Sequence, residues 1–163
     1  MRRFGPLFQR ESDGTFTVAL AADDREFLGS LADLLDKMVE AEPDDPWLRR
    51  LFPTAYPNDP EREQEWRLLM SVELHDKRRE QLRVLSETAS ADRLTEDELH
   101  AWTQALNGLR LYLGTRLDVT EDTEAEDFEA DDDRELFVLY NMLSLLQGEA
   151  IDALSQTLSP GDG

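Results

Sequence analysis

The stretch ELFVLYNMLSLLQGEAIDALSQTL, residues 135–158, carries the strongest fold signal in the chain. Its apolar side chains cover most of the circumference of a helix: Leu136, Phe137, Leu139, Tyr140, Met142, Leu143, Leu145, Leu146, Ile151 and Leu154. A helix that is apolar nearly all round is usually a buried one. We therefore predict a buried C-terminal helix at the centre of the molecule, with the other helices packed around it.

Three main helices are expected upstream of this stretch. The first runs from a capping aspartate, Asp23, to about residue 40. The second covers residues 60–87 and starts with an aspartate–proline pair, which suits the first turn of a helix. The third starts at LTEDEL, residues 94–99, which has the spacing of a capping box. The apolar stripe predicted for the second helix consists of Trp66, Leu69, Met70, Leu74, Leu82 and Leu85.

The N-terminus has the pattern of a β-hairpin. Residues 4–11 and 15–20 are strand-like, and the Asp13–Gly14 pair between them is a two-residue turn signal. A short fifth helix is expected near residues 47–52. The predicted fold class is therefore mainly α: an irregular four- to five-helix bundle with an N-terminal β-hairpin and a buried C-terminal helix. We expect a single domain over residues 1–158, with the hairpin in 1–20, an acidic flexible linker in 121–133 and a disordered tail in 159–163.

The chain of 163 residues is strongly acidic, with a formal net charge of −20. Such a charge repels phosphate backbones and favours a protein partner with a basic surface, so direct nucleic-acid binding is not expected. There is no cysteine, which excludes disulfides, thiol catalysis and thiol redox sensing. No apolar segment has the length of a membrane-spanning helix. We expect a soluble, cytoplasmic protein that is a monomer or a homodimer.

The acidity is concentrated in EDTEAEDFEADDDRE, residues 121–135, which holds ten carboxylates and one base. It has no glycine, which the sixth position of an EF-hand loop requires, so we interpret it as an acid-rich connection rather than a calcium site. Its carboxylates are candidates for contact with a basic partner: Glu121, Asp122, Glu124, Glu126, Asp127 and Glu129. A clamp onto the chain's own basic cluster, residues 77–83, is the competing interpretation.

No enzyme motif is present: the chain lacks a nucleophile elbow, a phosphate-binding glycine loop and the HExxH spacing. The alternative to a binding protein is a metal-dependent helical bundle or small enzyme that uses His75, His100 and nearby carboxylates. Only His100 has an acidic residue three positions earlier, Asp97. We predict no catalytic residue, no cofactor and no metal.

Two segments, LRRLFPTAYPNDPEREQEWRLL (48–69) and ALNGLRLYLGTRLDVTED (105–122), resemble an actinobacterial family of unknown function. The similarity extends over nearly the whole chain, from an RRFG-like start to the apolar last helix. Members are often encoded near the adaptor of the Clp protease, and the family includes the AosR-type oxidative-stress regulators that act with a sigma factor. Because that role is tied to cysteines, the resemblance implies here only regulation through protein contacts.

The resemblance implies a non-enzymatic regulatory or adaptor protein in a transcriptional stress response. The implied partner is a sigma factor, RNA polymerase or a Clp-system protein. The candidate partner-binding residues lie in the two segments that carry the resemblance: Arg49, Arg50, Phe52, Tyr56, Asn107, Arg110, Thr115 and Arg116.

Overall fold

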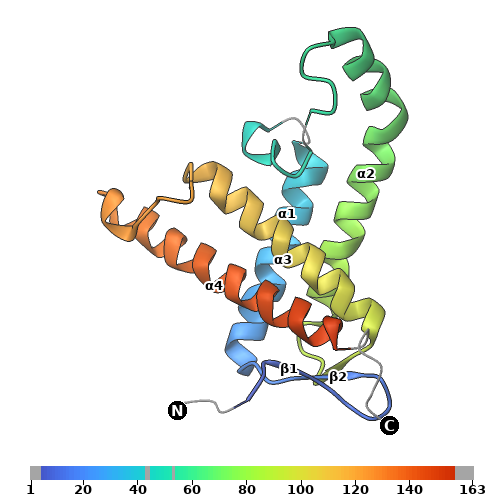
Figure 1. Ribbon diagram of the computed structural model, residues 1–163, viewed down its shortest axis with the longest axis vertical. Helices are drawn as coiled ribbons and strands as arrows, with labels where there is room; N and C mark the ends of the chain where they lie inside the picture. The colour runs from blue at the N-terminus through green and yellow to red at the C-terminus, as the bar shows by residue number, and fades with distance from the viewer. Residues whose placement is uncertain (1–4, 43–44, 53, 157–163) are drawn as a thin grey trace.

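The computed structural model describes residues 5–42, 45–52 and 54–156, and the predicted tail at 159–163 lies outside these residues. The elements follow one another as β1 (Phe8–Arg10), β2 (Phe16–Val18), α1 (Ala22–Ala41), η1 (Pro46–Leu48), α2 (Pro60–Thr88), β3 (Arg93–Leu94), α3 (Glu96–Arg116), η2 (Ala125–Asp127) and α4 (Asp131–Ser155), where η marks a 3-10 turn (Figure 1). The predicted mainly α fold with an N-terminal hairpin is confirmed.

The central helix is α3, which packs against α4 on one side and α2 on the other, while α1 packs mainly against α2 (Figure 1). The prediction that the C-terminal helix lies at the centre is therefore wrong. One side of α4 is buried through residues such as Phe137 and Leu143, but no described element covers its outer side. That outer side exposes Val138, Met142, Leu145 and Ile151. An apolar residue pattern around the whole circumference of α4 therefore does not mean that other elements cover the whole helix.

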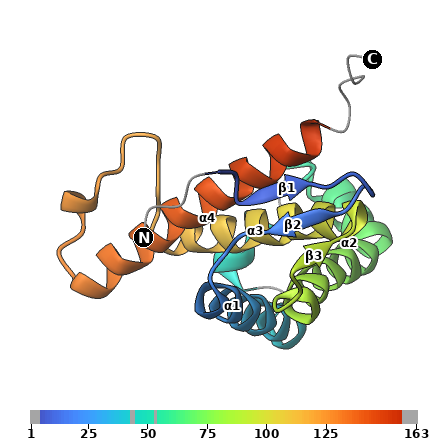
Figure 2. The same ribbon diagram turned by 90° about the horizontal axis from the view of Figure 1, so that it is seen from below.

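The hairpin closes the lower end of the bundle (Figure 2). β1 and β2 pair antiparallel with Phe8 opposite Val18, and β3, which we did not predict, adds to β2 with Leu94 opposite Phe16. All four of these apolar side chains are buried. The turn forms at the predicted place, with Gly14 at φ 86°. Its loop has three residues, 12–14, and not the two that we expected, because Arg10 lies opposite Phe16 and Glu11 N–H donates to the carbonyl of Thr15. The sheet is thus held by its apolar face on the helices.

The helix starts show which capping signals operate. Asp59 accepts a hydrogen bond from the backbone N–H of Arg62, as the aspartate–proline pair predicts. At α3 the capping box is complete, because Glu98 N–H donates to Thr95 Oγ1 at 3.1 Å and Thr95 N–H donates to Glu98 Oε1 at 2.8 Å. The predicted cap at Asp23 is wrong: α1 begins at Ala22, so this aspartate lies inside the first turn.

Replacing Thr95 with alanine should lower the free energy of unfolding by about 1 kcal/mol, because the first turn of α3 loses its side-chain acceptor. Urea denaturation followed by far-ultraviolet circular dichroism measures this loss. Replacing Thr95 with serine keeps the hydroxyl and is the matched control. An alanine variant as stable as the serine variant would contradict a role for the cap.

The acidic stretch forms a loop beyond one end of α3 and α4 (Figure 2). It contains η2, where Glu124 N–H donates to Asp127 Oδ2 at 2.8 Å, and the Phe128 ring lies 5.3 Å from that of Phe137 in α4. The last three residues assigned to the linker, 131–133, instead form the first turn of α4. Negative charge is favourable there because it interacts with the helix dipole.

Candidate functional site

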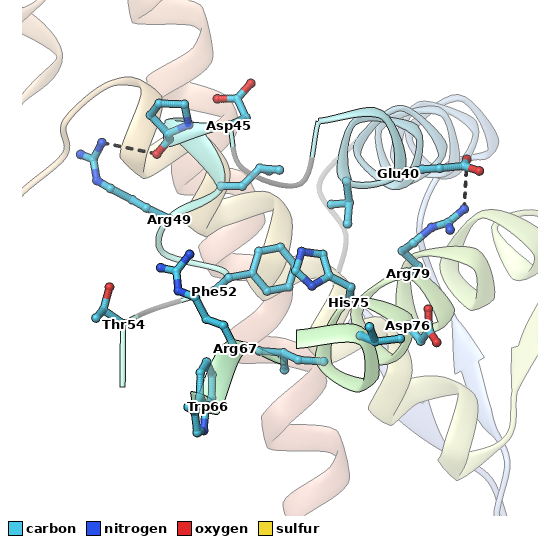
Figure 3. Close-up of a pocket in the computed structure, with 15 residues that line it drawn as sticks. Glu40, Asp45, Arg49, Phe52, Thr54, Trp66, Arg67, His75, Asp76 and Arg79 are labelled. Carbon is cyan, nitrogen blue, oxygen red and sulfur yellow. Dashed lines mark hydrogen bonds and ion pairs between the residues drawn. The ribbon is translucent and has the colours of Figure 1, made fainter. Parts of the chain in front are cut away.

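An open cleft of about 810 Å³ lies between the end of α1, the η1 segment and residues 66–79 of α2. Val39 and Glu40 line it from α1, and Leu48, Arg49 and Phe52 line it from the η1 segment (Figure 3). The α2 side is contributed by Trp66, Arg67, Val72, Leu74, His75, Asp76 and Arg79. The cleft therefore combines an apolar floor with charged groups of both signs.

Two stacked rings occupy the middle of the cleft. Phe52 and His75 lie with ring centroids 4.0 Å apart and their planes 10° from parallel (Figure 3). The resemblance pointed to Phe52 and the metal alternative pointed to His75, but no sequence pattern placed them together. His75 lies in the middle of α2, whereas Phe52 follows the 3-10 turn η1, so only tertiary packing joins them.

Most of the basic side chains around the cleft already have acidic partners. Arg67 Nε lies 3.0 Å from Glu63 Oε1, and a backbone hydrogen bond from Tyr56 together with Arg67 lowers the pKa of Glu63. Arg79 Nε lies 2.8 Å from Asp36 in α1, and its Nη2 lies 3.1 Å from Glu40. The hydrogen bond to Asp36 raises the pKa of Arg79.

These pairs contradict the predicted clamp between the basic cluster 77–83 and the acidic stretch. Arg79 and Arg83 both lie against Asp36, because α1 packs along α2. Arg78 is half-buried, and burial lowers its pKa. Within the acidic stretch the ion pair found among the described residues is local, between Arg134 and Asp131. The six candidate carboxylates of the stretch, residues 121–129, are all exposed.

The two segments that carry the resemblance, together with the adjoining Trp47, meet at the end of α3. Trp47 packs edge-on against Tyr112 with centroids 6.3 Å apart, and the Arg116 guanidinium lies 5.0 Å from the Trp47 ring centroid. Arg50 donates to the carbonyl of Val119 at 3.4 Å and passes over Gly114, where a Cβ would lie 2.9 Å from Arg50 Nη1. This glycine therefore leaves the space that the arginine uses.

The eight candidate partner-binding residues thus divide into groups. Arg49 and Phe52 line the cleft, and Tyr56 lies exposed beside the start of α2. Arg50 and Arg116 join η1 to α3, while Arg110 lies 5.9 Å from the Tyr140 ring and donates to Asn107. Thr115 is only 4% exposed and donates to the Leu111 carbonyl at 2.8 Å, so its side chain is not accessible to a partner.

The two histidines of the metal alternative lie in different places. His75 is in the cleft, whereas His100 is exposed near the start of α3, where its Nε2 lies 3.9 Å from Glu96. Within residues 5–42, 45–52 and 54–156, no three histidine, aspartate or glutamate side chains are grouped closely enough to hold a metal ion. The same residues contain no helix with the length and apolar content needed to cross a bilayer.

The sequence pattern did not indicate that the first half of α2 exposes several apolar side chains. Leu68 is 75% exposed, Leu69 78% and Val72 69%, and Met70 is also exposed. The predicted stripe is correct at Leu82 and Leu85, which are buried, but wrong at Leu69 and Met70. The reason is the length of α2: its 29 residues extend over about 43 Å, so its first half projects beyond the other helices (Figure 1).

Comparison with protein families gives one match, to the family model described as domain of unknown function DUF2017, which covers residues 1–154. No curated protein and no solved structure gives a significant match to the chain.

Proposed function

The chain belongs to the DUF2017 family, and from this premise we propose that it is a non-enzymatic, cytoplasmic regulatory or adaptor protein that acts through protein–protein contacts. The observation that carries the proposal is the exposed apolar surface formed by Leu68, Leu69 and Val72, which we call the α2 ridge. Contiguous exposed apolar side chains on a soluble domain are typical of interaction sites. The ridge adjoins the open cleft, since Val72 lines both.

The partner in this proposal has a basic surface. The net charge of −20 and the exposed carboxylates of residues 121–129 support that choice, because charge complementarity speeds association and selects partners. The resemblance to the AosR-type regulators supports a sigma factor, RNA polymerase or a Clp-system protein as the partner, in a transcriptional stress response. The proposal does not include thiol sensing, because the chain has no cysteine.

The proposal predicts that a partner depends on the α2 ridge. The tagged protein is used to capture partners from a native lysate of the source cells at low salt with crosslinking, and the recovered proteins are quantified by mass spectrometry. Replacing Leu68 and Leu69 with serine should reduce recovery of the specific partner about tenfold or more, as loss of a central apolar contact does. Both side chains are exposed, so the variant should keep the stability of the wild type.

A matched control replaces Val138 and Leu145, which are exposed on the outer side of α4, with serine. This variant should capture the partner as well as the wild type does. Recovery of no specific partner by the wild type, or equal recovery by the wild type and both variants, contradicts the proposed function.

A further inference from the structure

We infer that the α2 ridge binds a basic amphipathic helix of the partner protein, with one long basic side chain of that helix entering the adjacent cleft. This inference rests on the proposed function and specifies the partner's binding segment. It follows from the spacing of the exposed side chains, from the charges around them and from the position of the cleft.

The spacing of the ridge favours a helix. Leu68 and Val72 are one turn apart, and Leu69 lies beside them, so their side chains form a row along the helix axis. Rows of this kind pack into the grooves of a second helix. The backbone of α2 is hydrogen-bonded within the helix, so this surface has no free edge for a partner strand. The sheet, which has such edges, lies at the opposite end of the molecule (Figure 1).

The charges around the ridge favour a basic helix. Glu65 and Glu73 lie one turn before and one turn after Leu69, and Asp76 lies one turn after Val72. All three are exposed, as is Glu61, and none of the four forms an ion pair with another described residue. The bases Arg62 and Arg67 of the same half of α2 are paired with Asp59 and Glu63. Lys77, and Arg79 through its electrostatic interaction with Asp76, offset part of this charge.

The same charges disfavour the other occupants. A second copy of the chain would bring the four carboxylates of one ridge against those of the other, which is repulsive. The described ends of the chain, at β1 and at the end of α4, lie at the opposite end of the molecule from the ridge (Figure 1). A basic segment of a different protein is the occupant that both the apolar row and its acidic flanks accommodate.

The cleft supplies the second contact. Asp76 lines it beside Arg79, and the stacked rings of Phe52 and His75 lie in the same cleft (Figure 3). A lysine or arginine side chain combines an apolar stem with a charged head, so its stem can pack on apolar and aromatic walls while its head reaches a carboxylate. Arg79 makes its short contacts with Asp36 and Glu40 and interacts with Asp76 only electrostatically, so the Asp76 carboxylate keeps hydrogen-bonding capacity for a second basic group.

A synthetic peptide tests this inference directly. The probe is a peptide of about 18 residues, five helical turns, with leucine on one face and lysine and arginine on the other. The control peptide has the same composition with the leucines spread around the helix. Fluorescence anisotropy with the full chain should give about tenfold tighter binding of the amphipathic peptide. The Leu68→Ser/Leu69→Ser protein should bind it about tenfold more weakly, and the Val138→Ser/Leu145→Ser protein should bind it like the wild type.

A third variant, Glu73→Gln/Asp76→Asn, should reduce the dependence of binding on salt concentration, because it removes two of the flanking charges. Equal binding of the two peptides, or binding that does not depend on Leu68 and Leu69, overturns the inference. So does a dimer in light scattering that the same leucine substitutions dissociate, because the occupant is then a second copy. If partner capture depends on the ridge while the peptides bind equally, the helical inference fails and the proposed function stands.

Discussion

Replacing Trp102 with alanine should lower the free energy of unfolding by about 3–5 kcal/mol, the usual cost of removing a large aromatic side chain from a core. Trp102 is fully buried in α3. Its ring packs edge-on against Phe8 of β1 with centroids 6.0 Å apart, and its indole N–H donates to Thr88 Oγ1 at the end of α2, at 2.7 Å. One side chain thus joins the sheet, α2 and α3.

The loss is large because a single domain is stabilised by only about 5–15 kcal/mol in total. Urea denaturation followed by circular dichroism measures it, and native fold at zero denaturant is checked first. Trp47→Ala is the matched control. Because Trp47 is partly exposed, its replacement should lower the free energy of unfolding less than that of Trp102 does. Thr88→Val removes the acceptor of the indole hydrogen bond. It should lower the free energy of unfolding by about 1–3 kcal/mol, because the buried indole N–H of Trp102 is left without a partner. A Trp102→Ala variant no less stable than Trp47→Ala would contradict the central position of α3.

Replacing Gly29 with alanine should lower the free energy of unfolding by about 1–3 kcal/mol, the range found for overpacked cores. Gly29 is buried in α1 where that helix meets the end of α2. A Cβ at this position would lie 2.8 Å from the Cβ of Ala89 and 3.7 Å from the carbonyl oxygen of Ser86. Neither neighbour is the flexible end of a long side chain, so the two helices would have to move apart.

Gly148 in α4 provides a control of opposite sign. It is exposed within the helix, and apart from the neighbouring backbone of α4 itself no described atom lies within 4 Å of a Cβ built there. Gly148→Ala should therefore raise the free energy of unfolding by about 0.5–1 kcal/mol, because alanine loses less backbone entropy in a helix. Thermal and urea denaturation of the two variants in parallel measure the difference. The same direction of change in both would show that α1 and α2 are not in close contact at Gly29.

Only some residues of the candidate site could be predicted from the sequence, and the physical reason differs from one residue to the next. Phe52 and Arg49 were identified through a resemblance and do line the cleft. Of the α2 ridge only Leu69 was assigned to the core, together with Met70, because the periodicity of these residues is the same whether or not another element covers them. The partners of Arg79 could not be predicted either, since 37 acidic residues offer many equivalent carboxylates and only the packing of α1 on α2 selects Asp36.

The sequence by itself determined the features whose interacting groups lie within a few residues of one another in the chain. The capping box of Thr95 and Glu98 and the cap of α2 at Asp59 formed as predicted, because their hydrogen bonds join neighbours in the chain. The hairpin turn formed at Asp13–Gly14 for the same reason, although its loop is one residue longer than predicted. Only the tertiary structure decided that α3 rather than α4 is central, that β3 joins the hairpin, that Phe52 stacks on His75 and that half of α2 projects. An apolar periodicity specifies which face of a helix avoids water, but what covers that face depends on segments far away in the sequence.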